Sequence, residues 1–300
     1  MYRTLRAGAR TGYARENQRL VMGPWAHLLG YAKPETRGAG EADFGPEAAI
    51  ELHAIQRDWF DHFFRGTPLD GPRVRIFVLG ENRWRDEDDW PLARRVETPL
   101  YLRAGGSLSW EPPGDEEPDS YVSDPADPVP SLGGASLALP PGVFDQRPAE
   151  ARDDVLVYTG DVLAEPLEIT GDVTMTLHAA SSAPDCDFVA RVVDVHPDGY
   201  AWNVVDGVVA ARFRESTSEP TLIEPGHVYV YEIDLWATSI VIAAGHRLRV
   251  EIASSCFPRW IRNPQTGEEP VRATAFAVAD QQVFHDRARP SHLTLPVIPR

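Results

Sequence analysis

The chain has 300 residues, of which 43% are hydrophobic and 25% are charged, and its formal net charge is −16. This length suffices for one large domain or two ordinary ones, and the apolar fraction permits a sizeable core. The negative charge repels phosphate backbones and anionic lipid, which argues against nucleic acid and membrane surfaces as partners.

The first predicted elements surround a turn that carries a histidine. Residues 2–13 are weakly helical, and the apolar run 20–22 predicts a short strand that ends at Gly-Pro in positions 23–24. Trp25 and His27 follow directly. From spacing alone, His27 is either an ordinary loop or core histidine, which is the simpler interpretation, or an imidazole presented for chemistry.

A helix is expected after a loop over residues 30–45. Pro46 stands at a first helical position, and Gly66 follows the last periodic residue. The apolar residues of this segment recur at helical spacing: Ala48, Leu52, Ile55, Trp59 and Phe63. Such a stripe is typical of a buried face, so we expect the helix to pack on a sheet. His53 and His62, on or beside it, are expected to be structural.

Residues 74–78 alternate in polarity and predict a strand. An acidic run follows at residues 85–89, between Trp84 and Trp90. Hard cations need carboxylates spaced so that their oxygens converge, and this run lacks that spacing. We therefore expect a solvated loop anchored by the two tryptophans.

The pattern changes near residue 96, where helical periodicity gives way to short apolar runs between Pro, Gly, Asp and Asn turns. The runs are 98–102, 154–158, 172–178, 187–195, 201–205, 208–213, 227–235, 246–253 and 292–297. This spacing predicts an all-β sandwich. The expected division is one unit over residues 1–95 and a second over residues 96–300.

The other candidate sites lack a metal or cofactor signature. Cys186 and Cys256 are expected to be buried thiols rather than a disulfide or a metal pair. The remaining histidines are scattered without metal spacing, and glycine-rich phosphate loops are absent, so no metal or cofactor is expected. The paired serines at 181–182 and 254–255 are expected to bond to backbone rather than to catalyse.

No apolar signal-peptide core follows the basic N-terminus, and no run approaches the ~20 apolar residues of a membrane span. A soluble, cytoplasmic protein is the default expectation. A signal peptide lost with a mis-assigned start is the alternative that the sequence leaves open.

The turn Gly23-Pro24-Trp25-Ala26-His27 resembles the catalytic-histidine turn of the CocE/NonD serine hydrolases. That family includes cocaine-esterase-like enzymes, α-amino-acid ester hydrolases and relatives of the Xaa-Pro dipeptidyl-peptidases. Further stretches carry the likeness in order along nearly the whole chain: 59–66, 74–80, 84–91, 124–134, 145–148, 152–155, 187–194 and 254–263. The resemblance implies that His27 is the catalytic base.

The resemblance also implies a fold of the class α/β plus all-β. Residues 1–95 would be the C-terminal segment of an α/β-hydrolase domain, and residues 96–300 a jelly-roll β-sandwich like the C-terminal domain of Xaa-Pro dipeptidyl-peptidases. In this family the sandwich would wall one side of the acyl pocket and bind no catalytic metal.

The residues that His27 would serve are missing from the sequence. In α/β-hydrolases the triad follows the chain order Ser, then Asp or Glu, then His. No Ser, Cys or Asp precedes His27; the first Asp is Asp43, the first Ser is Ser107, and Glu16 is the only upstream carboxylate. No Gly-x-Ser-x-Gly occurs, and residues 105–109 lack its final Gly. The nucleophile and the acid are therefore expected outside this chain.

The resemblance implies Ser-His-Asp acyl transfer on an ester or amide bond, with a small ester or a short peptide as substrate. We expect a truncated or split gene and a companion chain that carries the missing hydrolase half. The first strand should then lack parallel neighbours and leave an apolar edge and face uncovered. Two other functions stay open: a non-catalytic jelly-roll binding module, for instance for carbohydrate, and an interaction domain left after loss of catalysis.

Overall fold

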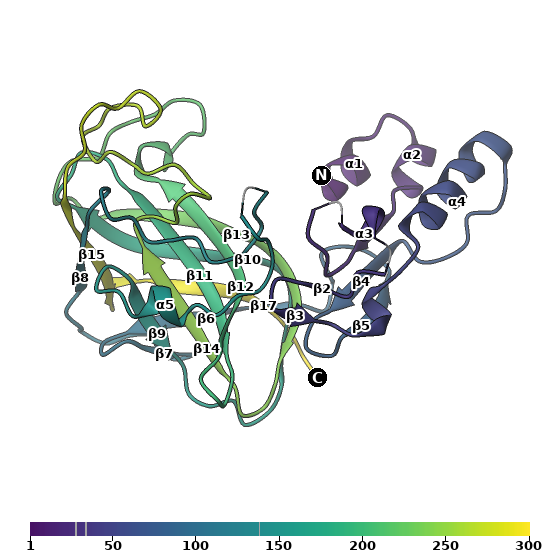
Figure 1. Cartoon of the computed structure of the whole chain (residues 1–300), viewed down its shortest axis with the longest axis horizontal. Coiled ribbons are helices and arrows are strands. Elements are labelled where there is room, and N and C mark those ends of the chain that lie inside the picture. Colours follow the sequence, from purple (N-terminus) through teal and green to yellow (C-terminus); the bar gives the residue numbers. More distant parts are fainter. Residues whose placement is uncertain (28, 34, 138) are drawn as a thin grey trace.

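A computed structural model describes residues 1–27, 29–33, 35–137 and 139–300. The chain forms two lobes, a large β-sandwich and a smaller lobe that holds the N-terminus and most of the helices (Figure 1). The helices are α1 (Tyr2–Gly8), α2 (Gly12–Glu16), α3 (Leu29–Ala32), α4 (Leu52–Arg65) and α5 (Arg147–Glu150), with 3-10 turns η1 (Pro46–Ala48) and η2 (Ala211–Phe213). No described helix is long and apolar enough to cross a bilayer.

The smaller lobe is built on a three-stranded sheet with the order β1-β4-β5. Its strands are β1 (Leu20–Met22), β4 (Val74–Val78) and β5 (Arg83–Glu87). β1 runs parallel to β4, with Leu20 opposite Val74. The prediction that the first strand lacks parallel neighbours is therefore wrong, because the chain returns after α4 and lays β4 along it. Within the described residues the other edge of β1 has no strand partner.

The acidic run lies partly in β5 and is not the solvated loop that its composition indicates. Arg85, in the middle of the strand, contacts Glu87 at 2.7 Å and Glu168 of the sandwich at 2.7 Å. The indole nitrogen of Trp84 donates to the carbonyl oxygen of Glu47 at 2.6 Å. Arg85 thus has one acidic partner on its own strand and one on the sandwich, and this pairing allows the charged sequence to form a strand.

Helix α4 begins at Leu52 rather than at Pro46, and Gly66 ends it in the left-handed conformation with φ 73°. The predicted apolar stripe is only partly buried: Leu52 is buried, whereas Ile55, Trp59 and Phe63 are half-buried. Phe60 and Phe64 are 50% and 81% exposed. The helix extends away from the sandwich (Figure 1), and the described residues leave its Phe60 and Phe64 side uncovered.

The larger lobe contains the remaining strands, which confirms that the regular structure is mostly β-sheet with few helices. They are β6 (Val96–Arg103), β7 (Ser107–Ser109), β8 (Asp119–Ser123), β9 (Leu156–Thr159), β10 (Leu167–Ser181), β11 (Asp187–Val195), β12 (Ala201–Ala210), β13 (Tyr229–Ile242), β14 (Arg247–Ala253), β15 (Ala279–Asp286), β16 (Arg289–Pro290) and β17 (His292–Ile298). Their order is β12-β11-β14-β9-β7-β6-β17-β10-β15-β16, with β13 paired to β10 and β8 to β15.

The sandwich core follows the predicted alternation. Val173, Met175 and Leu177 of β10 are at most 1% exposed and belong to the main hydrophobic cluster. The same cluster takes Val192 from β11 and Val250 from β14, so it joins the inner faces of both layers.

Two predicted runs, 201–205 and 208–213, form the single strand β12 up to residue 210. Gly207 lies in its middle, where a Cβ atom would stand 2.1 Å from the carbonyl oxygen of Asp234. A glycine is therefore required for β12 to approach β13 so closely.

Backbone and aromatic contacts fix the smaller lobe to the sandwich. The hairpin β2 (Gly38–Ala39) and β3 (Ala42–Asp43) bonds to the sandwich loop: Val143 N donates to Ala39 O at 3.1 Å, and Glu41 N donates to Val143 O at 2.8 Å. Phe44 packs 6.0 Å from the ring of Trp202 on β12. This junction places the sandwich loop near Val143 and strand β12 opposite the turn after β1.

Candidate active site

His27 lies in the turn at the carboxyl end of β1, with an exposed side chain. The indole of Trp25 shapes this turn: its Nε1 donates to the carbonyl oxygen of Ala48 at 2.8 Å. A Cβ atom on Gly23 would lie 2.2 Å from the Trp25 ring, and one on Gly30 would lie 2.9 Å from it. Only glycines fit against this ring, so the sequence of the turn accounts for its shape.

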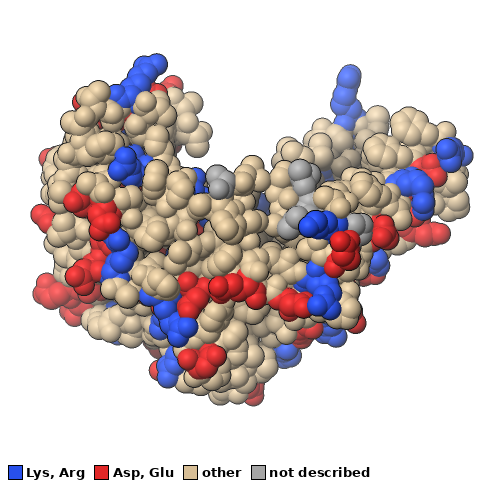
Figure 2. Space-filling model, viewed as in Figure 1, with Lys and Arg blue, Asp and Glu red and all other residues tan. Residues whose placement is uncertain are grey.

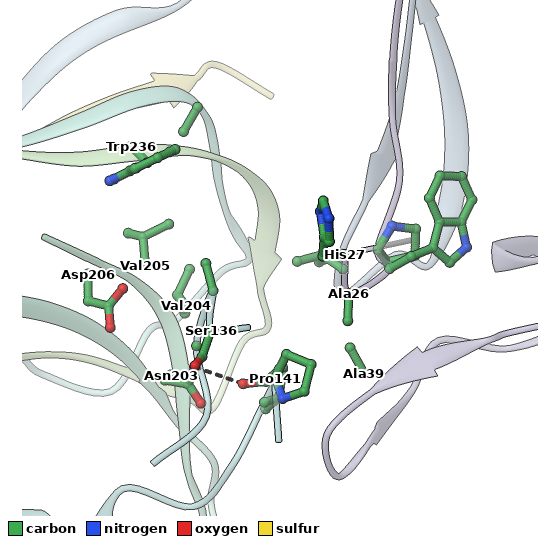
Figure 3. Close-up of a pocket in the computed structure, with 18 of the residues that line it drawn as sticks. Ala26, His27, Ala39, Ser136, Pro141, Asn203, Val204, Val205, Asp206 and Trp236 are labelled. Atoms are coloured by element: carbon green, nitrogen blue, oxygen red, sulfur yellow. Dashed lines mark hydrogen bonds between the residues drawn. The ribbon is translucent and has the colours of Figure 1, made fainter. Parts of the chain in front are cut away.

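A cavity of about 510 Å³ lies between this turn and the sandwich. Figure 2 shows a broad hollow between the two lobes. In Figure 3, Ala26 and His27 stand on one side of the cavity, and Val204, Val205 and Trp236 on the other. Loop residues 134–137 and 141–143 of the sandwich also line it. The cavity is thus made jointly by both lobes.

On the sandwich side of the cavity, Trp236 has an exposed side chain and an unusual backbone conformation. It is 70% exposed, and its backbone has φ 69°. The pairing of β10 with β13 shifts register at this position, between Asp172 and Thr174. A bulge of this kind re-aims a side chain, and here it presents the indole to the cavity.

The other polar groups of the cavity have partners of their own. Asp206 pairs with Arg259 at 2.5 Å. Asn203 accepts from Phe144 N at 2.8 Å and donates to Gly142 O, and Ser136 Oγ accepts from a backbone N–H at 3.2 Å. Across the described residues, no hydrogen bond joins the His27 ring to a hydroxyl or a carboxylate. The chain therefore presents an imidazole at a cavity, without an assembled triad around it.

The paired serines of the sandwich bond to groups outside the cavity. Ser255 Oγ accepts from Val129 N at 2.8 Å, and Ser182 Oγ accepts from Asp280 N at 2.9 Å. Ser181 accepts from Ala183 N, while Ser254 bonds to the hydroxyl of Tyr121 at 2.8 Å. These contacts are structural.

Both cysteines are buried free thiols, as predicted. Burial raises the pKa of Cys186 well above its ordinary value, which makes this thiol a poor nucleophile. His62 bonds to the Tyr13 hydroxyl at 2.9 Å and to the Thr67 carbonyl at 2.7 Å. The prediction of a structural role for His62 agrees with these bonds.

The structure brings together one group that sequence reasoning missed. Asp194, His196 and His246 place one potential ligand atom each within 4.8 Å of one another. The spacing of the histidines in the sequence predicts no metal site. The structure nevertheless brings two of them, with Asp194, into an arrangement that suits a metal ion. Asp194 and His196 are two apart at a strand end and share a face, but no local signal ties them to His246. None of the three lines the cavity beside His27.

Known proteins that are similar to this chain include a domain family and several esterases. Residues 69–294 match the X-Pro dipeptidyl-peptidase C-terminal non-catalytic domain, so His27 lies ahead of the matched part. Over 299 residues the chain is 44% identical to cocaine esterase of Rhodococcus sp. (strain MB1 Bresler), covering 94% of this chain and 52% of that enzyme. The chain spans about half the length of the curated relatives that it matches.

Two solved structures superpose on nearly the whole chain. An aminopeptidase from a marine sediment archaeon, Thaumarchaeota archaeon, gives a TM-score of 0.89 at 30% identity, covering 99% of this chain and 52% of that one. An α-amino acid ester hydrolase gives 0.86 at 32% identity, with 99% and 52% covered. This chain therefore belongs to the X-Pro dipeptidyl-peptidase C-terminal domain family.

Proposed function

We propose that this chain supplies the catalytic histidine and one wall of the acyl pocket of a serine ester or amide hydrolase. The Ser nucleophile and the Asp of the triad lie outside these 300 residues. The observation that carries the proposal is the position of His27, at the carboxyl end of parallel strand β1 and facing a two-sided cavity of about 510 Å³. Catalytic groups of α/β folds gather at the carboxyl ends of parallel strands.

In this proposal residues 1–95 are the last segment of an α/β-hydrolase domain and residues 96–300 are the jelly-roll domain. The free edge of β1 supports the first part, because a parallel sheet continues from such an edge. The uncovered side of α4, with Phe64 81% exposed, supports it as well, since this side needs a further layer. A companion polypeptide that carries the missing half would cover both surfaces.

In this proposal His27 transfers one proton in two successive steps. Its neutral imidazole takes the proton of the incoming serine hydroxyl as the oxygen attacks the substrate carbonyl. The same ring then returns the proton to the leaving alcohol or amine, while the carboxylate holds the other ring nitrogen. The exposed ring edge of His27 leaves room for both partners.

The substrate class follows from the cavity and from the relatives. Valine, leucine and tryptophan side chains line its sandwich wall, and they suit the acyl group of a small ester or a short peptide. Cocaine esterase and an α-amino acid ester hydrolase are among the similar proteins. Ester or activated-amide cleavage is the activity that these observations support best.

A non-catalytic binding module is the second candidate. The exposed indole of Trp236 favours it, because sugar rings stack on exposed aromatic side chains. Binding of glycans to the chain, lost in Trp236→Ala and unaffected in His27→Gln, would support this candidate over the hydrolase.

A fluorophosphonate probe tests the hydrolase proposal. The chain alone should remain unlabelled, with cocaine esterase as the positive control. When the part of cocaine esterase that precedes the similar region is fused to the chain, a serine of that added part should be labelled. The His27→Gln fusion should label far more slowly. Stoichiometric labelling of a serine within the 300 residues would contradict the proposal.

A further inference from the structure

Two histidines and one aspartate meet where the end of strand β11 lies beside the start of β14, its antiparallel partner in the sandwich. Asp194 lies near the end of β11, His196 follows that strand, and His246 directly precedes β14. The register pairs Val195 with Arg247, and its continuation by one residue sets His196 opposite His246. Asp194 lies two residues before His196 and therefore on the same face. The fold thus sets three metal-ligating side chains toward one point.

The contacts within this group leave one nitrogen without a partner. His246 Nδ1 is 2.8 Å from one carboxylate oxygen of Asp194. His196 Nε2 is 3.7 Å from the other oxygen, which is too far for a hydrogen bond. That Nε2 is a buried atom, and it has no hydrogen-bond partner among the residues that the structure describes. A buried ring nitrogen in this state costs free energy unless a further ligand satisfies it.

Asp194 also differs from the other buried carboxylates in its surroundings. It is 4% exposed, and the ionisable groups that face it are His246 and His196. Each other buried carboxylate in the described part of the chain contacts an arginine: Glu168 with Arg85, Asp185 with Arg212, Asp206 with Arg259, Glu251 with Arg191, and Asp286 with Arg289. Asp194 therefore lacks the strong cation that a buried carboxylate needs.

We propose that Asp194, His196 and His246 bind a divalent transition-metal ion, of which Zn²⁺ is the best match. Two imidazole nitrogens and one carboxylate oxygen are a common donor set for zinc, with bonds of about 2.0–2.2 Å. Ligand atoms of a tetrahedron with such bonds lie about 3.4 Å apart. The separations from His246 Nδ1 to one Asp194 oxygen, 2.8 Å, and from His196 Nε2 to the other, 3.7 Å, lie on either side of that distance.

The surroundings leave the fourth position to water. The side chains of His196 and His246 are 26% and 17% exposed, so the ion would be reached from solvent. The bound ion ties the β11–β12 turn to the β13–β14 turn. Since none of the three ligands lines the cavity beside His27, the expected effect is on stability and not on the acyl pocket.

Metal titration of the full chain, first freed of metal with a chelator, tests the site. Calorimetry should show one Zn²⁺ bound per chain, and Zn²⁺ should raise the Tm by several degrees. His196→Gln and His246→Gln should each weaken binding by a factor of about 100 or more and abolish the rise in Tm. His53→Gln, an exposed histidine of the other lobe, should bind Zn²⁺ as the wild type does.

Co²⁺ provides a measurement that does not depend on the variants. The wild-type chain should give the intense visible absorption of a tetrahedral Co²⁺ site, and Zn²⁺ should displace it. Absence of saturable binding, or binding that is equal in the wild type and the His196→Gln/His246→Gln double variant, would overturn the proposal. If those variants are less stable even without metal, the Co²⁺ spectrum of the wild type still shows whether the site binds a metal ion.

Discussion

The indole nitrogen of Trp25 donates a 2.8 Å hydrogen bond to the carbonyl oxygen of Ala48. This bond spans the chain from the turn after β1 to the 3-10 turn before α4, and it holds the segment that carries His27. The ring also contacts the indole of Trp84, with centroids 5.5 Å apart. The position of the imidazole therefore depends on a tryptophan two residues before it.

Trp25→Phe should destabilise the chain by about 1–2 kcal/mol, because it leaves the Ala48 carbonyl without its donor while keeping an aromatic ring. Urea unfolding measures this change, and hydrogen exchange should show faster exchange in residues 20–27. Trp110→Phe, at a 43% exposed position, is the matched control and should change stability by less than about 0.5 kcal/mol. Equal effects of both substitutions would contradict the role given to Trp25.

Gly23→Ala should cost about 1–3 kcal/mol, because the added Cβ would stand 2.2 Å from the Trp25 ring and displace it. Gly114→Ala is the control, since no atom lies within 4 Å of its added Cβ. Thermal unfolding of the two variants separates the effect of the Trp25 contact from the general effect of replacing glycine. A Gly23→Ala chain as stable as the Gly114→Ala chain would show that the ring is not held there.

His285 should make stability depend on pH. Burial lowers the pKa of this imidazole, but Asp119 at 2.9 Å and Glu116 at 3.3 Å outweigh burial, so its pKa is raised. A raised histidine pKa stabilises the fold fully below the unfolded value of about 6.5, and this contribution is lost as the pH rises through the folded pKa.

His285→Gln should therefore cost about 1.5–3 kcal/mol at pH 6, because it removes the charged hydrogen bond to Asp119 and the ion pair with Glu116, and less at pH 9. Denaturant unfolding at both pH values measures the difference, with substitution of the exposed His53 by Gln as the control. A loss that grows toward pH 9 would have the wrong sign for a protonated His285.

Phe64→Gln should leave the free energy of unfolding within about 0.5 kcal/mol of the wild type, because this ring is 81% exposed on α4. It should also reduce self-association in analytical ultracentrifugation, since it removes part of an uncovered apolar side. Phe44→Gln, at a position only 3% exposed, should instead be strongly destabilising. Unchanged self-association in Phe64→Gln would indicate that the α4 face does not need a covering layer.

The sequence predicts the sandwich well where its strands alternate or are apolar throughout. The run 187–195 coincides with β11, and 246–253 nearly coincides with β14. Polar strands escape the same reasoning: β15 contains Asp280, Gln281 and Gln282, which pair with β8 and β10 through backbone bonds. The strand propensity of these residues carries little information, because pairing with the neighbouring strands determines whether such a segment forms a strand.

The site is less predictable than the fold. His27 is singled out only by the resemblance of its turn to a known family, since one exposed histidine has no distinguishing pattern. The cavity depends on Trp236, whose side chain is aimed by a bulge that composition does not reveal. Asp194, His196 and His246 come from two separate hairpin ends, and only the strand register brings them together.

The most direct test of the central claim is the rate of ester hydrolysis by the fusion of this chain to the preceding part of cocaine esterase. The fusion should turn over small esters, and His27→Gln should lower kcat by a factor of about 10³–10⁴ or more, whereas His53→Gln should leave it unchanged. A His27→Gln fusion that hydrolyses the ester as fast as its parent would contradict the assignment of this imidazole as the base.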